Sequence, residues 1–398
     1  MSTTISNKIL SDRINRIELS ATMAISAEAL RMKASGISLS DFGAGEPHFA
    51  TPQHIKDAAI AAITANFTRY TAVSGTPEVR KAVVERHATD FGSNYAVEEC
   101  VFTTGGKQAL FNVMQVLVDH GDEVILPAPF WVSFKDIIQY AGGKVVLVKS
   151  DERENFRVTA KMIEAAITPK TKAIILNTPS NPSGAVVSPA DLEAIVRLAH
   201  ARGIFVLLDE CYTYLTYAGV PVSGGSFTDC KEHIVVLGSL SKTYAMTGWR
   251  AGFALGAKQV IAAMSKLQSQ STSNTTSFVQ KASIAALTGS QQCVVDMRTD
   301  YLKLRDRILA GFKTIPGLTC TVPQGAFYVY PNVSAFFGRG GLNTATDVAS
   351  RLLSEAGVVV VPSEPFGTSE HIRLSYAVSS DVVDEGVKRM REFFARLS

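Results

Sequence analysis

Short apolar runs alternate with amphipathic stretches through the middle of the chain. The runs lie at 101–103, 124–126, 145–148, 173–176, 204–208 and 234–237. The stretch 189–201 between two of them has the spacing of an amphipathic helix. Strands that alternate with helices form a mostly parallel sheet with helices on both faces. We therefore expect an α/β fold that binds its ligands beyond the carboxyl ends of the strands.

The pattern changes after about residue 290. A long helix is expected over 291–315, and it is followed by apolar runs at 318–321, 327–330, 358–361 and 372–374 and by helical patterns near 345–355 and 380–396. The mixture predicts a smaller α+β domain. The helical pattern before residue 40 is too short for a core of its own, so we expect an arm packed onto another unit. The predicted units are 1–45 for the arm and part of the small domain, 46–290 for the large domain and 291–398 for the small domain.

Three stretches of sequence predict helix starts. The pairs Thr51-Pro52 and Thr76-Pro77 each join an N-cap residue to a proline suited to the first helical position. Gly105, Gly106 and Lys107 follow the run 101–103 and open a helix over 108–118. Free backbone N–H groups at a glycine-rich helix start form an anion site, although close helix packing also selects glycine. Gly-x-Gly-x-x-Gly follows none of the strands, which argues against a dinucleotide-binding fold.

Composition narrows the range of partners. The chain has 398 residues, a formal net charge of +3 and no basic run, so we expect a small-molecule partner and no nucleic acid. Its 5 cysteines lie far apart and form no metal-ligand spacing with histidines, so we expect reduced thiols and no metal site. The first residues are polar and no apolar run approaches the ~20 residues that span a bilayer, so we expect a cytoplasmic protein without a membrane segment.

Lys242 follows the run 234–237 and is flanked by small and hydroxylic residues. A partly desolvated lysine amine can form a Schiff base with a carbonyl. Ser239, Ser241 and Arg250 would supply the donors that a phosphate needs. Together these residues suggest pyridoxal phosphate. The alternative is that Lys242 is a solvated charge at the end of a strand.

The order Ser-x-x-Lys and then Gly-x-Arg-x-Gly around Lys242 resembles fold-type I, class I pyridoxal-phosphate-dependent aminotransferases. The sequence Ala-Met-Thr-Gly-Trp-Arg at 245–250 is most similar to that of the bacterial aspartate aminotransferases of this family, subgroup Ib. The resemblance implies a large domain with a mostly parallel seven-stranded sheet flanked by helices, plus a smaller α+β domain. It implies pyridoxal 5'-phosphate as cofactor, Lys242 as the catalytic residue and a homodimer with shared active sites.

Further motifs of the same family occur in family order from about residue 20 to 376. Asp209 ends the run 204–208, and Tyr212 follows three positions later. The resemblance implies that Asp209 pairs with the ring nitrogen and that Tyr212 bonds the phenolate oxygen; the residues alone leave Asp209 equally suited to capping a helix. Asn181 lies in a Pro- and Gly-rich turn that is similar to the family's Asn-Pro-x-Gly, in which the asparagine donates to that same oxygen.

The resemblance extends to the substrate. Trp131 follows the run 124–126, and the resemblance places its indole against the cofactor ring and, with Asn181, beside the substrate. Arg373 lies within an apolar strand pattern and so needs an anion; the family arginine at this place binds the substrate α-carboxylate. The backbone N–H of Gly45 corresponds to one aimed at that carboxylate. Tyr70 corresponds to a tyrosine that reaches the cofactor phosphate of the partner subunit.

Recognition of a second carboxylate is assigned to Lys107. The segment 268–278 contains no arginine or lysine, unlike the subgroup in which an arginine of the partner subunit does this work. The other subgroup uses the lysine of Gly-Gly-Lys, helped by hydroxyls that correspond to Ser20 and Thr22. Alternatively, Lys107 is a solvated residue of the first helical turn. Some relatives that accept prephenate have a basic residue where this chain has Glu18, so we expect poor prephenate activity.

The predicted activity is transfer of the amino group of L-aspartate to 2-oxoglutarate by a ping-pong mechanism, with amino acids and 2-oxo acids as the small-molecule substrates. Alternative enzyme activities are a broader, aromatic or aliphatic specificity, prephenate or glutamate transamination, and a lyase reaction on the same scaffold. A different class of alternative is a cofactor-binding regulatory protein without turnover.

Overall fold

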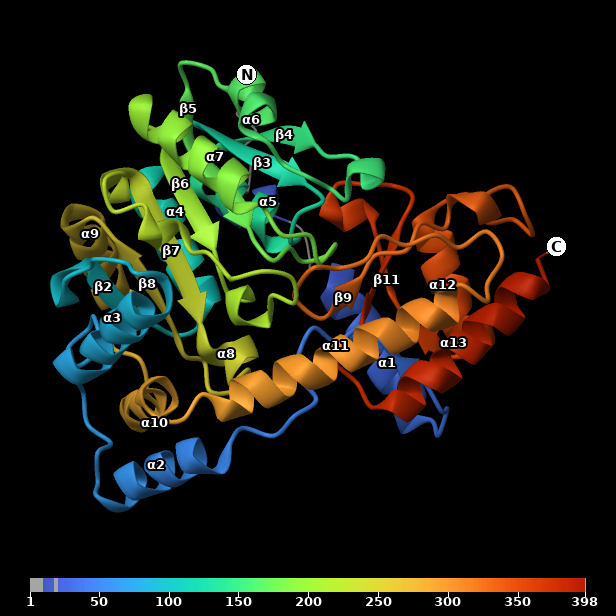
Figure 1. Ribbon diagram of the computed structural model, residues 1–398, viewed down its shortest axis with the longest axis horizontal. Coiled ribbons are helices and arrows are strands. Elements are labelled where there is room, and N and C mark those ends of the chain that lie inside the picture. Colours follow the sequence, from blue (N-terminus) through green and yellow to red (C-terminus); the bar gives the residue numbers. More distant parts are fainter. Residues whose placement is uncertain (1–9, 18–20, 398) are drawn as a thin grey trace, which may run out of the picture.

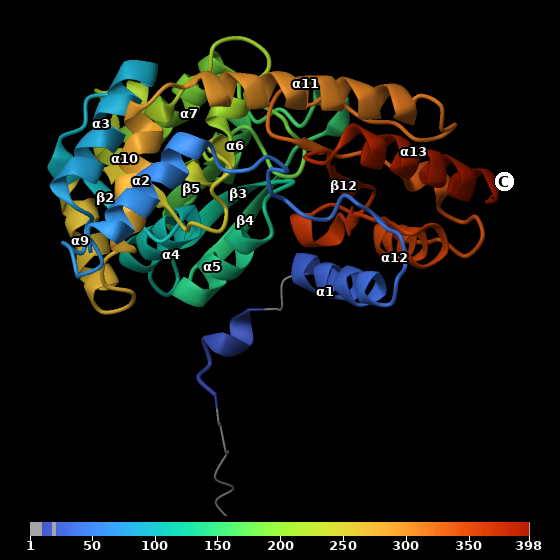
Figure 2. The same ribbon diagram turned by 90° about the horizontal axis from the view of Figure 1, so that it is seen from below.

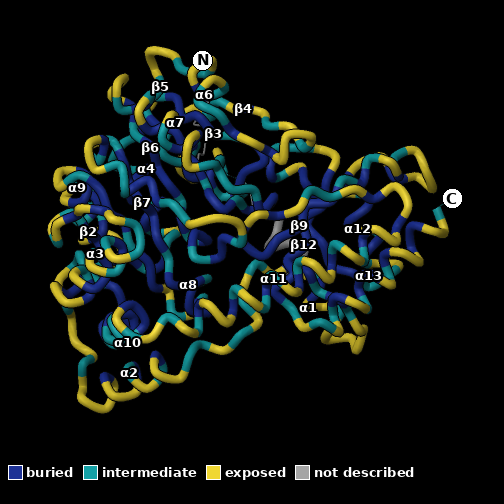
Figure 3. The backbone as a smooth tube through the Cα atoms, viewed as in Figure 1, coloured by how far each residue is buried: buried dark blue, intermediate teal, exposed yellow. Residues whose placement is uncertain are grey.

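The computed structural model describes residues 10–17 and 21–397, with the side chains of residues 21–26 left outside the description. Figure 1 shows the large sheet within the part of the chain before α11, beside the small sheets that lie near the C-terminal helices. Most strands are buried, except the edge strand at 144–149, and exposure is concentrated on the outer faces of the helices and on the loops (Figure 3). The fold is therefore of the α/β class, as predicted, with a mostly parallel seven-stranded sheet flanked by helices.

The large sheet has the strand order β2-β8-β7-β6-β5-β3-β4. The bounds of its strands, in that order, are Cys100–Thr103, Gly252–Gly256, Ile234–Ser239, Phe205–Asp209, Thr171–Asn177, Glu123–Ala128 and Lys144–Lys149. β8 pairs antiparallel with both of its neighbours, whereas the pairs from β7 to β4 are parallel. The parallel strands thus end at one edge, and the loops that follow them meet there.

Helices cover both faces of this sheet. One face packs against α4 (Gly106–Leu117), α5 (Ser133–Ala141) and α9 (Lys258–Ser269). The other face is covered by α3 (Pro77–Phe91), α6 (Ala160–Ala166), α7 (Pro189–Ala201) and α10 (Ser277–Thr288), with α2 (Gln53–Thr64) packed on α10. Burial on both faces explains why the sheet strands read as continuous apolar runs without alternation.

A second core lies around the small sheets. The antiparallel sheet β11-β12-β9 consists of Val361–Pro362, Ile372–Ser375 and Tyr328–Val329, and the parallel pair β1-β10 consists of Ser40–Asp41 and Val358–Val359. Around them lie α1 (Ala21–Ala34), α11 (Gln292–Phe312), α12 (Ala345–Ala356) and α13 (Ser380–Ala395), with α1 beside α12 (Figure 2). The N-terminal segment therefore joins this core through β1 and α1. The domain boundaries at 45/46 and 290/291 stay predictions.

Short 3-10 helices complete the described chain. They are η1 (Ile14–Arg16), η2 (Val97–Glu99), η3 (Glu152–Glu154), η4 (Thr213–Leu215), η5 (Gly224–Ser226), η6 (Lys231–His233), η7 (Ser334–Phe336) and η8 (Glu364–Phe366), and α8 (Leu240–Thr243) is a single turn after β7. The longest helix, α11, spans both cores: Val294 packs in the large core, whereas Met297 and Tyr301 pack in the small one.

Of the two Thr-Pro pairs predicted to cap and start a helix, one does so. Thr76 accepts a hydrogen bond from the N–H of Val79 and Pro77 occupies the first turn of α3, as predicted. The same prediction for Thr51 is wrong. Pro52 occupies the N-cap position of α2, while the Thr51 hydroxyl donates to the carbonyl of Ala245 at 2.6 Å and accepts from the indole N–H of Trp249. A tertiary contact thus replaces the local cap.

The predicted strand at 318–321 is also wrong. Only Thr319 forms an isolated antiparallel bridge, with Asn332, because no neighbouring strand extends along the segment. The run 358–361 divides into β10 and β11, which join different sheets. β8 was missed, since its glycine-rich sequence at 252–256 carries a weak strand signal.

Candidate functional site

A cavity of about 620 Å³ opens where the loops after the parallel strands face the small sheet. It brings together residues from loops that lie far apart in the sequence. The predicted site residues that line it are Gly45, Gly106, Lys107, Trp131, Asn181, Asp209, Tyr212, Ser239, Ser241, Lys242, Arg250 and Arg373. Convergence of these residues in one cavity is what a ligand-binding site at the carboxyl edge of the sheet requires.

Lys242 lies in the single-turn helix α8, directly after strand β7. Its ammonium group donates a hydrogen bond to the carbonyl oxygen of Gly45. Burial lowers the pKa of Lys242 and outweighs the raising effects of Cys211 and Glu46, while the positive charges of Arg250 and Arg373 lower it slightly further. A lysine that loses its proton more readily than usual is suited to act as a nucleophile and as a base.

Asp209 ends β6, and its carboxylate accepts a hydrogen bond from the N–H of Cys211 at 3.2 Å. Burial raises the pKa of Asp209 to about 6, and this bond only partly offsets the effect. A buried carboxylate in this state favours a cationic partner. Asn177, at the end of the adjacent strand, supports the edge because its amide donates to the carbonyl of Asp209 and accepts from the N–H of Asn181.

Tyr212 is buried, and its hydroxyl lies 2.8 Å from the hydroxyl of Tyr328. Tyr328 comes from β9 of the small sheet, so this contact joins that sheet to the loop that follows β6 of the large sheet, and both rings pack in the second core. The Tyr328 hydroxyl also occupies the space beside Gly45, since a Cβ at that position would lie 2.6 Å from it. Only glycine fits at position 45, because any side chain there would collide with the hydroxyl of Tyr328.

The start of α4 and the turn after α8 form the predicted anion site. Gly105, the N-cap of α4, has a φ of 82°, and a Cβ there would lie 2.4 Å from Nη2 of Arg250. Arg250 itself has a φ of 55° and donates to the carbonyl of Thr247 at 2.8 Å. The Ser239 hydroxyl accepts from the N–H of Ser241 at 3.1 Å. Backbone N–H groups, hydroxyls and a guanidinium thus face one place, which suits a phosphate.

Arg373 is only 3% exposed and lies on β12. One terminal nitrogen donates to the side-chain oxygen of Asn181 at 3.2 Å, and the other donates to the carbonyl of Gly43 at 2.7 Å. Its Nε is buried and has no hydrogen-bond partner within the described part of the chain. The carbonyl and amide oxygens do not neutralise the guanidinium charge, so this side of the cavity is suited to a carboxylate.

Lys107 and Trp131 lie against each other at the cavity wall. The Lys107 ammonium is 4.7 Å from the centroid of the indole ring. Burial lowers the pKa of Lys107, and the charge of Arg250 adds to the effect. The site therefore has a second cation besides Arg373, held by a cation–π contact in place of a carboxylate.

Two described residues of the predicted site do not line the cavity, Gly105 and Tyr70. Tyr70 is 91% exposed, as a residue that reaches another subunit would be in a single chain. Ser20 and Glu18 lie outside the described residues, and Thr22 belongs to α1 although its side chain is outside the description. The proposed contacts of Ser20 and Thr22 with a substrate stay predictions.

Sequence reasoning missed several residues of the cavity, among them Asn177 and Tyr328. Asn177 was included in no motif, although its position at the end of a parallel strand was a usable signal. Tyr328 lies within a predicted strand whose alternation does not tell which face meets the cavity. Cys211 also lines the cavity, and burial raises its pKa well above the ordinary value.

Among residues 10–17 and 21–397, no three His, Cys, Asp or Glu side chains are grouped in a way that could hold a metal ion. No described helix is both long and apolar enough to cross a bilayer.

Pyridoxal phosphate fits the residues of the cavity. Gly105 leaves room for the Arg250 guanidinium at the start of α4, where it could meet a phosphate, and buried Asp209 would find its cationic partner in a protonated pyridine nitrogen. Lys242 lies between these groups with a lowered pKa. The unpartnered Nε of Arg373 and its Nη groups would then face the substrate.

Comparison with known proteins gives one consistent result. Residues 38–390 match the family model for aminotransferase class I and II. The aspartate aminotransferase of Geobacillus stearothermophilus is 41% identical over 96% of this chain and 98% of its own length. The aspartate/prephenate aminotransferase of Cereibacter sphaeroides is 39% identical over 98% of this chain and 99% of its own. A solved structure of the aspartate aminotransferase from Thermus thermophilus with maleate has a TM-score of 0.92 and 40% identity, covering 96% of this chain and 99% of that one.

Proposed function

Because this chain belongs to the class I and II aminotransferase family, whose members depend on pyridoxal 5'-phosphate, we propose that it transfers the amino group of L-aspartate to 2-oxoglutarate. The observation that carries the proposal is the convergence of Lys242, Asp209 and Arg373 in one cavity. The aspartate aminotransferase relatives, alike over nearly their whole length, support the choice of substrate.

The cofactor, when bound, draws electrons from the α-carbon of the substrate and carries the amino group between the two half-reactions. Arg373 binds the α-carboxylate and so fixes the α-carbon beside Lys242. Burial lowers the pKa of Lys242, which can therefore take the α-proton as the general base. The same amine would deliver the proton to C4′ of the cofactor. Asp209 keeps its negative charge against the ring nitrogen, and Tyr212 and Asn181 donate towards the phenolate oxygen.

Lys107 supplies the preference for a dicarboxylate. Its ammonium lies over Trp131 at the cavity wall and would face the distal carboxylate of aspartate or glutamate. A carboxylate bound there without a cation would lose several kcal/mol of solvation. Substrates with neutral side chains gain nothing from this contact, which favours aspartate over alanine or phenylalanine.

The test is a panel of amino donors with 2-oxoglutarate as acceptor. The expected order of kcat/KM has aspartate first, with alanine and phenylalanine at least about tenfold lower, from the loss of one charged contact. Higher activity with phenylalanine or leucine would establish the aromatic or aliphatic alternative, and high activity with prephenate would overturn the expectation drawn from Glu18. A cofactor-loaded protein that fails even a single turnover with aspartate would instead be a regulatory protein.

We also propose a cytoplasmic homodimer that shares its active sites. The exposed Tyr70 and the apolar Ile60 and Ile63 on α2 support a covering partner subunit, since isolated chains seldom leave such residues together in water. All five cysteines are free thiols, which supports a reducing compartment.

A further inference from the structure

One face of the small sheet contacts the large core along its whole length. β9 and β12 pair antiparallel, with Ser375 opposite Tyr328, and beyond the strands Asn332 lies opposite His371. Because alternate residues share a face, Tyr328, Arg373 and His371 all point the same way. Tyr328 reaches Tyr212, and Arg373 reaches Asn181. The His371 end of this face makes a third contact, outside the cavity that holds Lys242.

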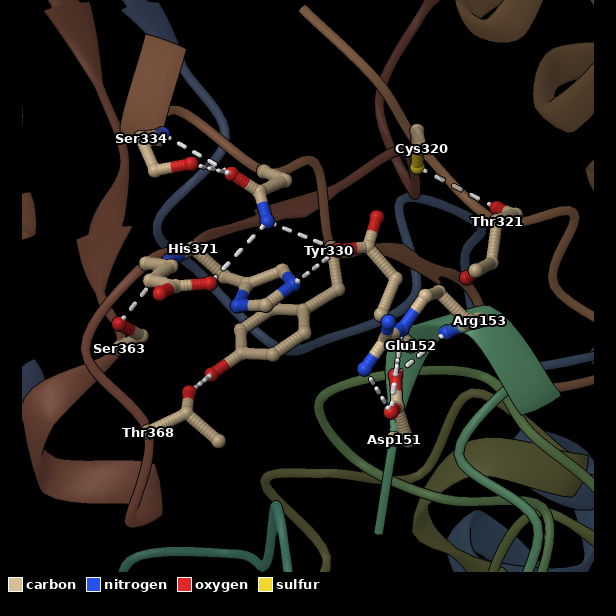
Figure 4. A network of polar contacts seen from close by, with 12 residues as sticks. Asp151, Glu152, Arg153, Cys320, Thr321, Tyr330, Ser334, Ser363, Thr368 and His371 are labelled. Atoms are coloured by element: carbon tan, nitrogen blue, oxygen red, sulfur yellow. Dashed lines mark hydrogen bonds and ion pairs between the residues drawn. The ribbon is translucent and has the colours of Figure 1, made fainter. Parts of the chain in front are cut away.

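The third contact is formed by Glu152 of η3, which follows the edge strand β4 of the large sheet. Figure 4 shows its carboxylate reaching the imidazole of His371, whose ring lies over that of Tyr330. Oε2 of Glu152 is 3.1 Å from Nε2 of His371 and accepts from the amide of Asn332 at 2.8 Å. The two rings are stacked, with centroids 4.7 Å apart and planes inclined by 7°. We call the set of Glu152, His371 and Asn332 the clasp.

The clasp is built from side chains that have little freedom. His371 is 5% exposed, its backbone N–H donates to the hydroxyl of Ser363, and the hydroxyl of Tyr330 is bonded to Thr368 at 2.6 Å. The imidazole therefore has one orientation, set from both sides. A carboxylate that bonds it from the other core fixes the distance between that core and the start of β12.

Arg373 follows His371 by two positions on this strand, and its own contacts cross the same boundary. Arg373 can bind a carboxylate in one geometry only if β12 keeps a fixed distance from Asn181 and from the loop that contains Gly43. The bond from Arg373 to Asn181, at 3.2 Å, is by itself a weak constraint. On the basis of the proposed function, we propose that Glu152 and His371 are positioning residues for substrate binding: their contact holds β12 against the large core so that Arg373 meets the α-carboxylate.

The carboxylate of Glu152 carries the charge of the clasp. Burial alone would raise the pKa of Glu152, but hydrogen bonds from His371 and Asn332 outweigh it, so the pKa is lowered and the carboxylate stays ionised. The other charged groups facing the clasp are Glu370, which lies beside Asn332, Asp151 and Arg153, which pair with each other, Lys149, which lines the same groove as Glu152 and His371, and Arg373 itself. A hydrogen bond to an ionised acceptor is stronger than a neutral one, so removing the charge of Glu152 should weaken the clasp.

The experiment is titration calorimetry of the cofactor-loaded protein with maleate, a dicarboxylate that lacks the amino group and cannot react. Glu152→Gln keeps the length of the side chain and an oxygen for Asn332 but removes the charge. Glu154→Gln makes the same change two positions away on the exposed side of η3 and is the matched control. The ratio of the variant Kd to the wild-type Kd is measured at one neutral pH.

We expect Glu152→Gln to weaken maleate binding about three- to tenfold, as loss of a charge-assisted hydrogen bond does. Glu154→Gln should leave the Kd unchanged. In turnover, Glu152→Gln should raise KM for aspartate and alanine alike with kcat nearly unchanged, since the α-carboxylate is common to both. His371→Gln should also weaken binding, since it replaces the ring that the carboxylate bonds.

A Glu152→Gln ratio near 1 would overturn the proposal. So would an equal effect of Glu154→Gln. Arg373→Gln separates this failure from failure of the proposed site. If Arg373→Gln binds maleate as the wild type does, the assignment of the carboxylate site is wrong; if it binds poorly while Glu152→Gln binds normally, only the clasp is wrong. Thermal unfolding of each variant distinguishes a positioning effect from a loss of fold.

Discussion

The hydroxyl groups of Tyr212 and Tyr328 lie 2.8 Å apart, and the ring of Tyr328 lies 4.8 Å from the guanidinium carbon of Arg373. One side chain of the small sheet thus contacts both a residue predicted to bind the cofactor and the residue predicted to bind the substrate. Burial raises the pKa of Tyr328 to about 12, so its hydroxyl remains a neutral donor or acceptor at physiological pH. Hydrogen bonds in such a chain strengthen one another.

Tyr328→Phe should weaken the donation of Tyr212 to the bound cofactor while keeping the ring beneath Arg373. We expect the pKa of the cofactor's visible absorption change to rise, by less than in Tyr212→Phe, because only the supporting hydrogen bond is lost. A spectroscopic pH titration of the holoenzyme measures this. Tyr301→Phe is the matched control: Tyr301 is fully buried, and its hydroxyl has no partner among the described residues. If the titration of Tyr328→Phe coincided with that of the wild type, Tyr328 would not strengthen the hydrogen bond that Tyr212 donates to the cofactor.

The stability of the cofactor-free protein should depend on Asp209. Burial raises its pKa to about 6, above the ordinary value near 3.8, so between pH 4 and 6 the folded state binds more protons than the unfolded state. The free energy of unfolding therefore falls as pH rises through this window, by at most about 3 kcal/mol, and is fully recovered only at low pH. Asp209→Asn should lose this dependence and be more stable than the wild type at pH 7. The measurement is denaturant unfolding of both apoproteins at pH 4.5 and 7. If the free energy of unfolding changed equally between the two pH values in both proteins, the role assigned to Asp209 would be contradicted.

Lys107→Ala should impair the reaction of dicarboxylates selectively. If the Lys107 ammonium meets the distal carboxylate, the variant loses roughly 2–4 kcal/mol of transition-state binding with aspartate and much less with alanine or phenylalanine. Steady-state kcat/KM for the three donors gives the comparison. An equal loss for all donors would assign Lys107 to the phosphate or to the fold of the α4 start, where its charge opposes the helix dipole.

Tyr70 should act on the opposite active site of a homodimer. It is 91% exposed in the single chain, which leaves its hydroxyl free to reach a partner. Hybrids of Tyr70→Phe and Lys242→Ala subunits should contain one intact site and regain activity above that of either parent, provided that each parent is sufficiently impaired. Sedimentation should give the mass of two chains. A monomer with full activity would rule the arrangement out.

The apolar runs predicted the large sheet because most of its parallel strands are buried on both faces. Such a strand is a continuous apolar run, which can be recognised in the sequence without knowledge of its neighbours. The motifs that follow strands 101–103, 173–176, 204–208 and 234–237 could be placed at one edge for the same reason. β8 escaped because its short sequence, Gly-Phe-Ala-Leu-Gly, has glycine at both ends and carries a weak strand signal without its antiparallel neighbours. Tyr328 and Glu152 escaped because their partners, Tyr212 and His371, lie more than a hundred residues away and no local pattern encodes the pairing. Thr51 failed as a cap because its hydroxyl is taken by Ala245.

The central claim is that Lys242 holds the cofactor covalently in the cavity that also contains Asp209 and Arg373. Borohydride reduction of the purified holoenzyme, followed by peptide mass spectrometry, tests it most directly, because reduction makes the lysine–cofactor linkage permanent. We expect the cofactor adduct on the peptide that contains Lys242, no adduct in Lys242→Ala, and loss of both the visible band and multiple turnover in that variant. An adduct on Lys107 or on another lysine, or a Lys242→Ala protein that turns over normally, would contradict the account.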